Sequence, residues 1–190
     1  MELILASSSP YRRALLSRLH VPFRCEAPRV DETPFPGEQP VDLALRLARQ
    51  KARAVAGENP RALVIGSDQV ACVEGSVLGK PGDPETAASQ LRASSGRPVR
   101  FYTGLALIGD GCEYSLVETF TVHFRHLGEK EIDSYLRKEQ PFDCAGSFKC
   151  EGLGVALFER LEGDDPTALE GLPLIATCRL LRQAGLDVLG

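Results

Sequence analysis

The chain has 190 residues, which suits one domain with a substantial buried core. Hydrophobic residues make up 43% and charged residues 25%, which is ordinary for a globular protein and excludes the disordered and fibrous classes. The net charge of −4 speaks against binding to nucleic acid or membrane by overall electrostatic attraction, so local basic clusters must bind any anion.

The sequence also indicates a cytoplasmic protein without a membrane segment. No apolar stretch approaches the length of a membrane span. The chain starts with a short apolar run that has no basic leader and no cleavage site, so we interpret it as a strand and not as a signal peptide. The six cysteines are scattered without a C-x-x-C pair, which is typical of thiols in a reducing compartment.

The first segment predicts a strand, a serine-rich loop and a helix. Leu3–Ala6 is apolar, Ser7–Ser9 follows, and the residues from Tyr11 to Leu19 have helical periodicity. Ser9 suits the N-cap and Pro10 the first helical position. The free amides and positive end of this helix then point into the serine loop, which is a phosphate-binding geometry.

Arg12 and Arg13 stand in the first turn of that helix, where positive charges oppose the helix dipole. They are either two solvated side chains or ligands of an anion bound at the loop. We favour the anion because it would resolve the conflict with the dipole.

The next segment places an acidic pair before a helix. Asp31 and Glu32 lie in a proline-rich loop and either cap a helix or hold a metal ion. The residues from Val41 to Ala56 predict a helix whose apolar stripe includes Lys51. This lysine either extends to solvent or is directed at a fixed negative charge, and we favour the second reading.

Ala62–Ile65 reads as a buried strand that ends at Gly66. Asp68 then falls at or just past its carboxyl end, where open α/β sheets place ligands, although an aspartate there is also common as a cap or turn residue. A hairpin follows over residues 70–78, and Lys80 comes after it in a Gly-Lys-Pro sequence that is not a Walker motif.

The remaining pattern predicts further helices and strands. Glu151 lies in a polar, glycine-punctuated stretch and is either a solvated loop acid or a ligand-binding residue. The expected elements are a helix over residues 84–94, strands over 99–108 and 113–125, a helix over 129–140, a strand over 155–158 and a closing helix over 172–181.

Several motifs together resemble the Maf family of nucleotide pyrophosphatases across nearly the whole chain. Within that family the chain looks like the YceF-type branch, which is associated with 7-methyl-GTP. Tyr11 and Cys150 depart from the pattern, since close relatives often have tryptophan and serine there. The matching motifs are Ser7-Ser-Ser-Pro-Tyr-Arg-Arg-x-Leu-Leu, Val30-Asp-Glu-Thr, Lys51-Ala, Gly66-Ser-Asp-Gln-Val, Gly79-Lys-Pro, Cys144-Ala-Gly-Ser-Phe-Lys-x-Glu-Gly and Gly171-Leu-Pro-Leu.

The resemblance implies a single domain over residues 1–190 with an elongated α/β fold like that of inosine-triphosphate pyrophosphatases. In this fold helices flank a central mixed sheet, and a ligand cleft lies between two lobes. The resemblance also implies hydrolysis of the bond between the α and β phosphates with a divalent cation. Asp68 looks like the catalytic acceptor, while Tyr11, Gln69 and Glu151 look like the base-selecting positions.

The chemistry of a triphosphate assigns the remaining roles. Asp68 either takes the proton of the attacking water or, beside Glu32, holds Mg²⁺ or Mn²⁺, and the sequence leaves both roles open. Arginine binds phosphate as a fork and lysine as a point charge. The expected phosphate-binding residues are Ser7, Arg12, Arg13, Lys51 and Lys80.

Other functions remain open from the sequence. The substrate can be another nucleotide, such as GTP, UTP or dTTP. The family name also suggests a nucleotide-binding regulator of septum formation that needs no turnover. We expect a nucleoside triphosphate as the partner, no nucleic acid and no membrane, and we leave open whether the chain forms a homodimer.

Overall fold

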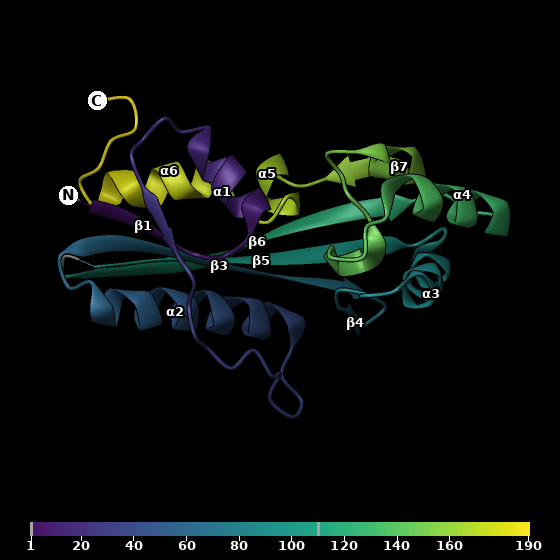
Figure 1. The fold of residues 1–190 in the computed structure, drawn as a ribbon, viewed down its shortest axis with the longest axis horizontal. Helices are drawn as coiled ribbons and strands as arrows, with labels where there is room; N and C mark the ends of the chain where they lie inside the picture. Colours follow the sequence, from purple (N-terminus) through teal and green to yellow (C-terminus); the bar gives the residue numbers. More distant parts are fainter. Residues whose placement is uncertain (1, 110) are drawn as a thin grey trace. The chain divides into compact units, whose positions relative to one another are not determined.

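The structure, a computed structural model, describes residues 2–109 and 111–190. Strands and helices mostly alternate along the chain (Figure 1). The strands are β1 (Glu2–Ala6), β2 (Arg24–Glu26), β3 (Ala62–Val73), β4 (Ser76–Leu78), β5 (Pro98–Gly109), β6 (Cys112–Phe124) and β7 (Phe158–Glu162). The α-helices are α1 (Pro10–Ser17), α2 (Pro40–Glu58), α3 (Pro84–Ser94), α4 (Glu129–Glu139), α5 (Pro166–Leu169) and α6 (Leu174–Gln183), and two 3-10 helices cover Ala145–Ser147 and Leu153–Leu157.

The strands in the described residues form a seven-stranded sheet in the order β2-β1-β3-β5-β6-β7, with β4 paired to β3 off this path. Strand β1 is parallel to both β2 and β3. Strand β4 is antiparallel to β3, and β7 is antiparallel to β6. The sheet is therefore mixed, which confirms the expected α/β class.

The chain divides into two compact units. The first unit consists of the residues up to Gln69 together with Tyr102–Glu118 and Asp165–Gly190. The second unit consists of Val70–Phe101 and Thr119–Asp164. Strands β3, β5 and β6 contribute residues to both units.

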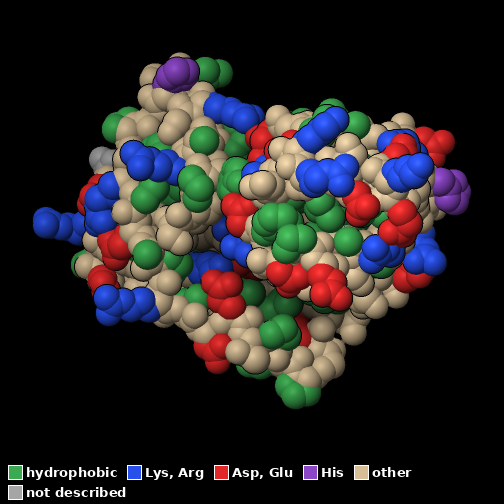
Figure 2. Space-filling view, turned by 45° about the vertical axis from the view of Figure 1, so that its right-hand side comes forward, with side chains coloured by type: hydrophobic (Ala, Val, Ile, Leu, Met, Phe, Trp, Pro, Cys, Tyr) green, Lys and Arg blue, Asp and Glu red, His purple; other side chains and the backbone are tan. Residues whose placement is uncertain are grey.

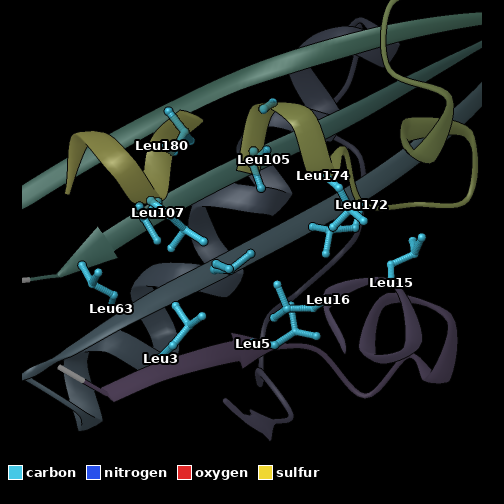
Figure 3. Close-up of a cluster of buried hydrophobic side chains, with 13 residues drawn as sticks. Leu3, Leu5, Leu15, Leu16, Leu63, Leu105, Leu107, Leu172, Leu174 and Leu180 are labelled. Carbon is cyan, nitrogen blue, oxygen red and sulfur yellow. The ribbon is translucent and has the colours of Figure 1, made fainter. Parts of the chain in front are cut away.

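The first unit has helices on both faces of its strands, as expected (Figure 1). Successive side chains of a strand point to opposite faces, so each strand supplies two cores. On one face, Leu5 and Ile65 pack with leucines of α1 and α6 (Figure 3). On the other face, Ile4 and Val64 pack against the alanine-rich side of α2.

The second unit has an aromatic core. Phe148 makes edge-to-face contacts with Phe101, Phe124 and Phe158, and its ring centroid lies between 4.9 and 5.5 Å from theirs. Such edge-to-face pairs add to the free energy gained by burying the rings. Helix α3 packs against α4 in the same unit.

Two predicted elements are wrong. Strand β3 does not end at Gly66 but continues to Val73, so Asp68 lies inside the strand. Residues 155–158 are not a strand, because they belong mostly to the 3-10 helix Leu153–Leu157 and β7 begins only at Phe158. The short helix α5 was also missed, since the sequence was interpreted as a turn there. No helix in the described residues is both long and apolar enough for a membrane crossing.

Candidate active site

The alternation of side chains along β3 explains where Asp68 points. A Cβ at Gly66 would lie 2.3 Å from the carbonyl oxygen of Ala48 in α2, so this face of β3 touches the helix backbone. Asp68 is two residues further and shares that face. Ser67 and Gln69 face the opposite side, where their side chains bond to the segment after α5 and to α5 itself. The missing side chain at Gly66 thus lets α2 approach Asp68 closely.

Asp68 also lies at the edge of the parallel part of the sheet. The last paired residues of β1 and β3 are Ala6 and Gly66, and Asp68 follows two residues later. Ser7 follows β1 directly and is buried. The structure therefore places Asp68 beyond the carboxyl end of the parallel pairing, but inside β3 and not at or past the end of the strand as the sequence predicted.

Lys51 joins two carboxylates in what we call the carboxylate–lysine cluster, formed by Glu32, Lys51 and Asp68. The Lys51 Nζ atom lies 2.7 Å from Asp68 Oδ1 and 2.8 Å from Glu32 Oε1. Lys51 and Asp68 are only 6% and 8% exposed, while the Glu32 side chain is 59% exposed. Lys51 is therefore directed at fixed negative charge, as the sequence predicted.

Glu32 and Asp68 carry the oxygen ligands that a divalent cation prefers. One oxygen of each carboxylate contacts Lys51 Nζ, so the two carboxylates lie close to each other on either side of the ammonium. The described residues contain no group of three or more acidic, histidine or cysteine side chains that could form a complete metal cage. Mg²⁺ commonly uses one or two carboxylates and takes its other ligands from water and substrate phosphates.

Arg12 is the second cation near the cluster. Its Nε donates a hydrogen bond to the Gly171 carbonyl oxygen at 2.8 Å. Burial lowers the pKa of the Arg12 guanidinium, while the charges of Asp68 and Glu32 act in the opposite direction. Arg12 is half-buried, so an anionic ligand beside it would stabilise its positive charge.

The loop before α1 has the predicted cap. Ser9 is the N-cap of α1, and its side chain accepts a hydrogen bond from the Arg12 backbone N–H at 3.4 Å. The Ser7 Oγ atom accepts a hydrogen bond from the Ser9 backbone N–H at 3.1 Å. The loop therefore curls back on itself at the positive end of the helix, next to the end of β1.

Arg13 and Tyr11 are placed differently from Arg12. Arg13 is exposed and lines a surface pocket of about 720 Å³ together with Ser17 and residues 20–25. Tyr11 is half-buried in the first turn of α1. Their expected contacts with phosphate and base remain predictions.

Gln69 is engaged inside the protein. Its side-chain nitrogen donates to the carbonyl oxygens of Ala168 and Leu169 at 2.8 and 3.1 Å. The neighbouring Thr103 hydroxyl also donates to the Ala168 carbonyl, at 2.9 Å. The amide nitrogen therefore anchors helix α5, and the side-chain oxygen is the atom that remains for a ligand.

Three residues that shape the site were missed from the sequence. Ser67 Oγ lies 3.0 Å from the Gly171 carbonyl oxygen, which also accepts the hydrogen bond of Arg12. Asp165 is 3% exposed and accepts hydrogen bonds from Thr167 N and Ile175 N, so it ties α5 to the start of α6. Thr103 is the third. Strand alternation was the available signal for Ser67 and Thr103, while the Asp-Pro pair was interpreted only as a turn.

Lys80 and Glu151 belong to the second unit. Lys80 is exposed just after β4, and Glu151 is exposed in the turn before the 3-10 helix Leu153–Leu157. Near them, Gln90 Nε2 donates to the Gly79 carbonyl at 3.0 Å and Gln90 Oε1 accepts from Ser147 Oγ at 2.6 Å. Their approach to a ligand at Asp68 remains a prediction.

Comparison with known proteins identifies the family. The family model described as "Maf-like protein" matches residues 2–184.

The chain belongs to this Maf-like protein family.

A curated relative is 58% identical to this Maf-like chain over 189 residues, which is 98% of this chain and 95% of the relative. It is a protein of Nitrosococcus oceani named 7-methyl-GTP pyrophosphatase. The family expected from the motifs is thus confirmed.

Two solved structures are similar to the Maf-like chain at a lower level. The Ham1 protein of Staphylococcus aureus gives a TM-score of 0.49 at 17% identity, covering 65% of this chain and 72% of its own. A HAM1 protein from Coxiella burnetii gives 0.48 at 18% identity, covering 93% and 98%. At these scores the two structures say nothing about activity.

Proposed function

We propose that this Maf-like protein hydrolyses 7-methyl-GTP between the α and β phosphates to 7-methyl-GMP and pyrophosphate. The observation that carries the reaction type is the carboxylate–lysine cluster, in which a buried Asp68 is paired with Lys51 and Glu32. The choice of nucleotide is supported by the name of the relative that is 58% identical over nearly the full chain.

The phosphates would be held by the cations of the first unit, with help from Lys80. A nucleoside triphosphate carries about four negative charges, and preorganised cations stabilise the charge that develops on the departing pyrophosphate. Lys51 has three N–H donors, and its two carboxylate contacts leave one for a phosphate oxygen. Arg12 presents a fork whose Nε is fixed by Gly171. Ser7 and the amides before α1 would complete the phosphate contacts.

Asp68 has two possible roles, general base or metal ligand, and the contact with Lys51 is compatible with both. As a base, it would accept the proton of the attacking water while Lys51 holds the carboxylate in place. As a ligand, it would share Mg²⁺ or Mn²⁺ with Glu32. Such a cation, when bound, would neutralise charge on the phosphates. In both roles the carboxylate must stay where the ammonium holds it.

Base selection would involve Tyr11, Gln69 and Glu151. Methylation at N7 makes guanine cationic, so the face of a tyrosine ring gains about 1 kcal/mol from a cation–π contact. A carboxylate such as Glu151 can accept the two hydrogens on the Watson–Crick edge of guanine, which uracil and thymine do not offer. Gln69 would contribute its oxygen, because its nitrogen is bonded to α5.

The surface charges and the free thiols support a small-molecule substrate in the cytoplasm. On the face shown in Figure 2, basic and acidic side chains are interspersed, unlike the continuous basic stripe of a nucleic-acid-binding protein. Cys25, Cys72 and Cys178 are free thiols, which fits a reducing compartment. Sedimentation can decide whether the chain forms a homodimer, which the sequence leaves open.

A panel of nucleotides tests the proposal. Release of pyrophosphate should be measured for 7-methyl-GTP, GTP, UTP and dTTP with Mg²⁺ and with Mn²⁺. We expect the highest kcat/KM for 7-methyl-GTP, with 7-methyl-GMP and pyrophosphate formed in equal amounts. An equal or higher value for UTP or dTTP would reassign the substrate, while tight binding without any product at either metal would indicate a nucleotide-binding regulator.

A further inference from the structure

We infer that Arg46 is a positioning residue that holds the loop carrying Glu32 on helix α2, so that Glu32 reaches Lys51 and Asp68. The inference rests on the proposed function, in which Glu32 helps to hold the divalent cation. Arg46 itself lies on α2 and is half-buried.

The guanidinium of Arg46 contacts two points of the loop between β2 and α2, which covers residues 27–39. Its Nε and Nη2 donate to the two carboxylate oxygens of Glu38 at 2.6 and 2.8 Å. Nη2 also lies 3.1 Å from the carbonyl oxygen of Thr33, the residue directly after Glu32. Nη1 donates to Gln50 on the next turn of α2 at 3.0 Å, which orients the fork. One side chain therefore holds the loop at Thr33, next to Glu32, and at Glu38, just before α2.

Arg46 also contacts the loop between Thr33 and Glu38. The Cζ atom of Arg46 lies 4.0 Å from the centroid of the Phe35 ring, which gives a cation–π contact. The Phe35 backbone N–H donates to Glu38 at 3.0 Å. Residues 31–37 are all exposed, so the loop has no buried core of its own. Its order comes from these polar contacts.

The geometry of α2 links this anchor to the site. Arg46 and Lys51 are five residues apart on one helix, a rise of roughly 7.5 Å. Two consecutive loop residues contact these two side chains: Glu32 pairs with Lys51, and the Thr33 carbonyl accepts a hydrogen bond from Arg46. Loss of the Arg46 contact therefore releases the residue next to Glu32.

The contact between Arg46 and Glu38 also shifts the pKa values of both partners. Hydrogen bonds from Arg46 are the main cause that lowers the pKa of Glu38 to about 2, and the same bonds raise the pKa of Arg46. The pair is bidentate, a geometry that lysine cannot reproduce because its ammonium is a point charge.

The test compares Arg46→Ala, Arg46→Lys and Arg53→Ala. Arg53 is a matched control, because it is an arginine of the same helix whose exposed side chain pairs with Glu113, away from the loop. Two quantities are measured on each purified protein: hydrogen exchange of the backbone over residues 31–38, and binding of Mn²⁺ followed by electron paramagnetic resonance.

We expect Arg46→Ala to accelerate exchange in residues 31–38 and to weaken Mn²⁺ binding by roughly 10-fold, the size seen when a residue supporting a metal ligand is lost. In turnover assays, the Mn²⁺ concentration for half-maximal activity should rise by a similar factor while kcat at saturating Mn²⁺ changes little. Arg46→Lys should recover part of the loss, and Arg53→Ala should behave like the wild type.

Unchanged exchange in the loop would overturn the inference, and so would faster exchange with unchanged Mn²⁺ binding. A wild-type protein that cleaves no nucleotide would instead count against the proposed function. The exchange and binding measurements would still decide the role of Arg46 in that case, since neither needs turnover.

Discussion

Replacing Lys51 with methionine tests the carboxylate–lysine cluster through protein stability. Methionine is long and unbranched like lysine, so it fills the same space but removes the charge. The Asp68 carboxylate, only 8% exposed, would then lose the ammonium that lies 2.7 Å from it. Removal of one partner from a buried ion pair leaves an uncompensated charge, which is why the change is costly.

The expected loss is about 3 kcal/mol of unfolding free energy, at the lower end of the range for broken buried pairs. Lys51 and Asp68 are both nearly buried, so solvent screens their attraction little. The contact with Glu32 adds less, because that side chain is 59% exposed. For a chain of this size, about 3 kcal/mol corresponds to a drop in Tm of roughly 6–12 °C.

Urea unfolding followed by circular dichroism measures the effect, with Asp68→Asn and the double variant as the other corners of a cycle. The double variant removes both charges, so it should be destabilised by clearly less than the sum of the two single changes. Exact additivity of the two changes, or an unchanged midpoint for Lys51→Met, would refute the pairing.

Three further changes test other parts of the account. Gly66→Ala places a Cβ against the backbone of α2 and should lower the free energy of unfolding, measured in urea, by about 1–3 kcal/mol. The control Gly57→Ala, at a position of α2 with no neighbouring atoms, should leave this free energy unchanged or raise it by up to about 1 kcal/mol. Equal effects of the two changes would contradict the close approach of α2 to β3. Hydrogen bonds from Arg46 lower the pKa of Glu38 from 4.5 to about 2. The contribution of this contact to stability is therefore complete above pH 4.5 and is lost as the pH falls toward 2. A titration of the Glu38 carboxyl by NMR with a midpoint near 4.5 would contradict the contact. Glu151→Ala should narrow the difference in kcat/KM between 7-methyl-GTP and UTP more than it lowers the rate on UTP, and an unchanged ranking of substrates would remove Glu151 from base selection.

Much of the fold follows from local sequence signals. Ser9 and Pro10 predict the start of α1 because a hydroxyl cap and a residue without an N–H suit those two positions, and the structure has both. The hairpin of β3 and β4 was predicted around Glu74 and Gly75, which the structure places in left-handed backbone conformations. These signals act over a few residues, so they survive without knowledge of the tertiary structure.

Both wrong strand predictions lie at a glycine that leaves no room for a side chain. Gly66 was interpreted as the end of a strand, but it sits inside β3 because only a residue without a side chain lets α2 come so close. Gly154 has a similar role, since a Cβ there would lie 2.2 Å from the carbonyl oxygen of Lys149. That close turn shapes a 3-10 helix where an apolar run had predicted a strand.

The sequence predicted the charged residues of the candidate site but not the hydrogen bonds that hold the neighbouring segments in place. Lys51 on an apolar stripe indicated a buried negative partner, and Asp68 is that partner. The bonds of Ser67 and Gln69 to the segment around α5 join residues 99–104 positions apart. No local pattern encodes such pairs, because they depend on how distant segments pack.

The most direct test of the central claim is single-turnover hydrolysis of 7-methyl-GTP by Asp68→Asn beside the wild type, with nucleotide binding measured by calorimetry on both proteins. Asparagine keeps the size of the side chain and removes its basicity and charge. The account predicts that cleavage slows by roughly 10²–10⁴-fold while 7-methyl-GTP still binds. Cleavage at the wild-type rate would show that the phosphates are split without Asp68 and would contradict the account.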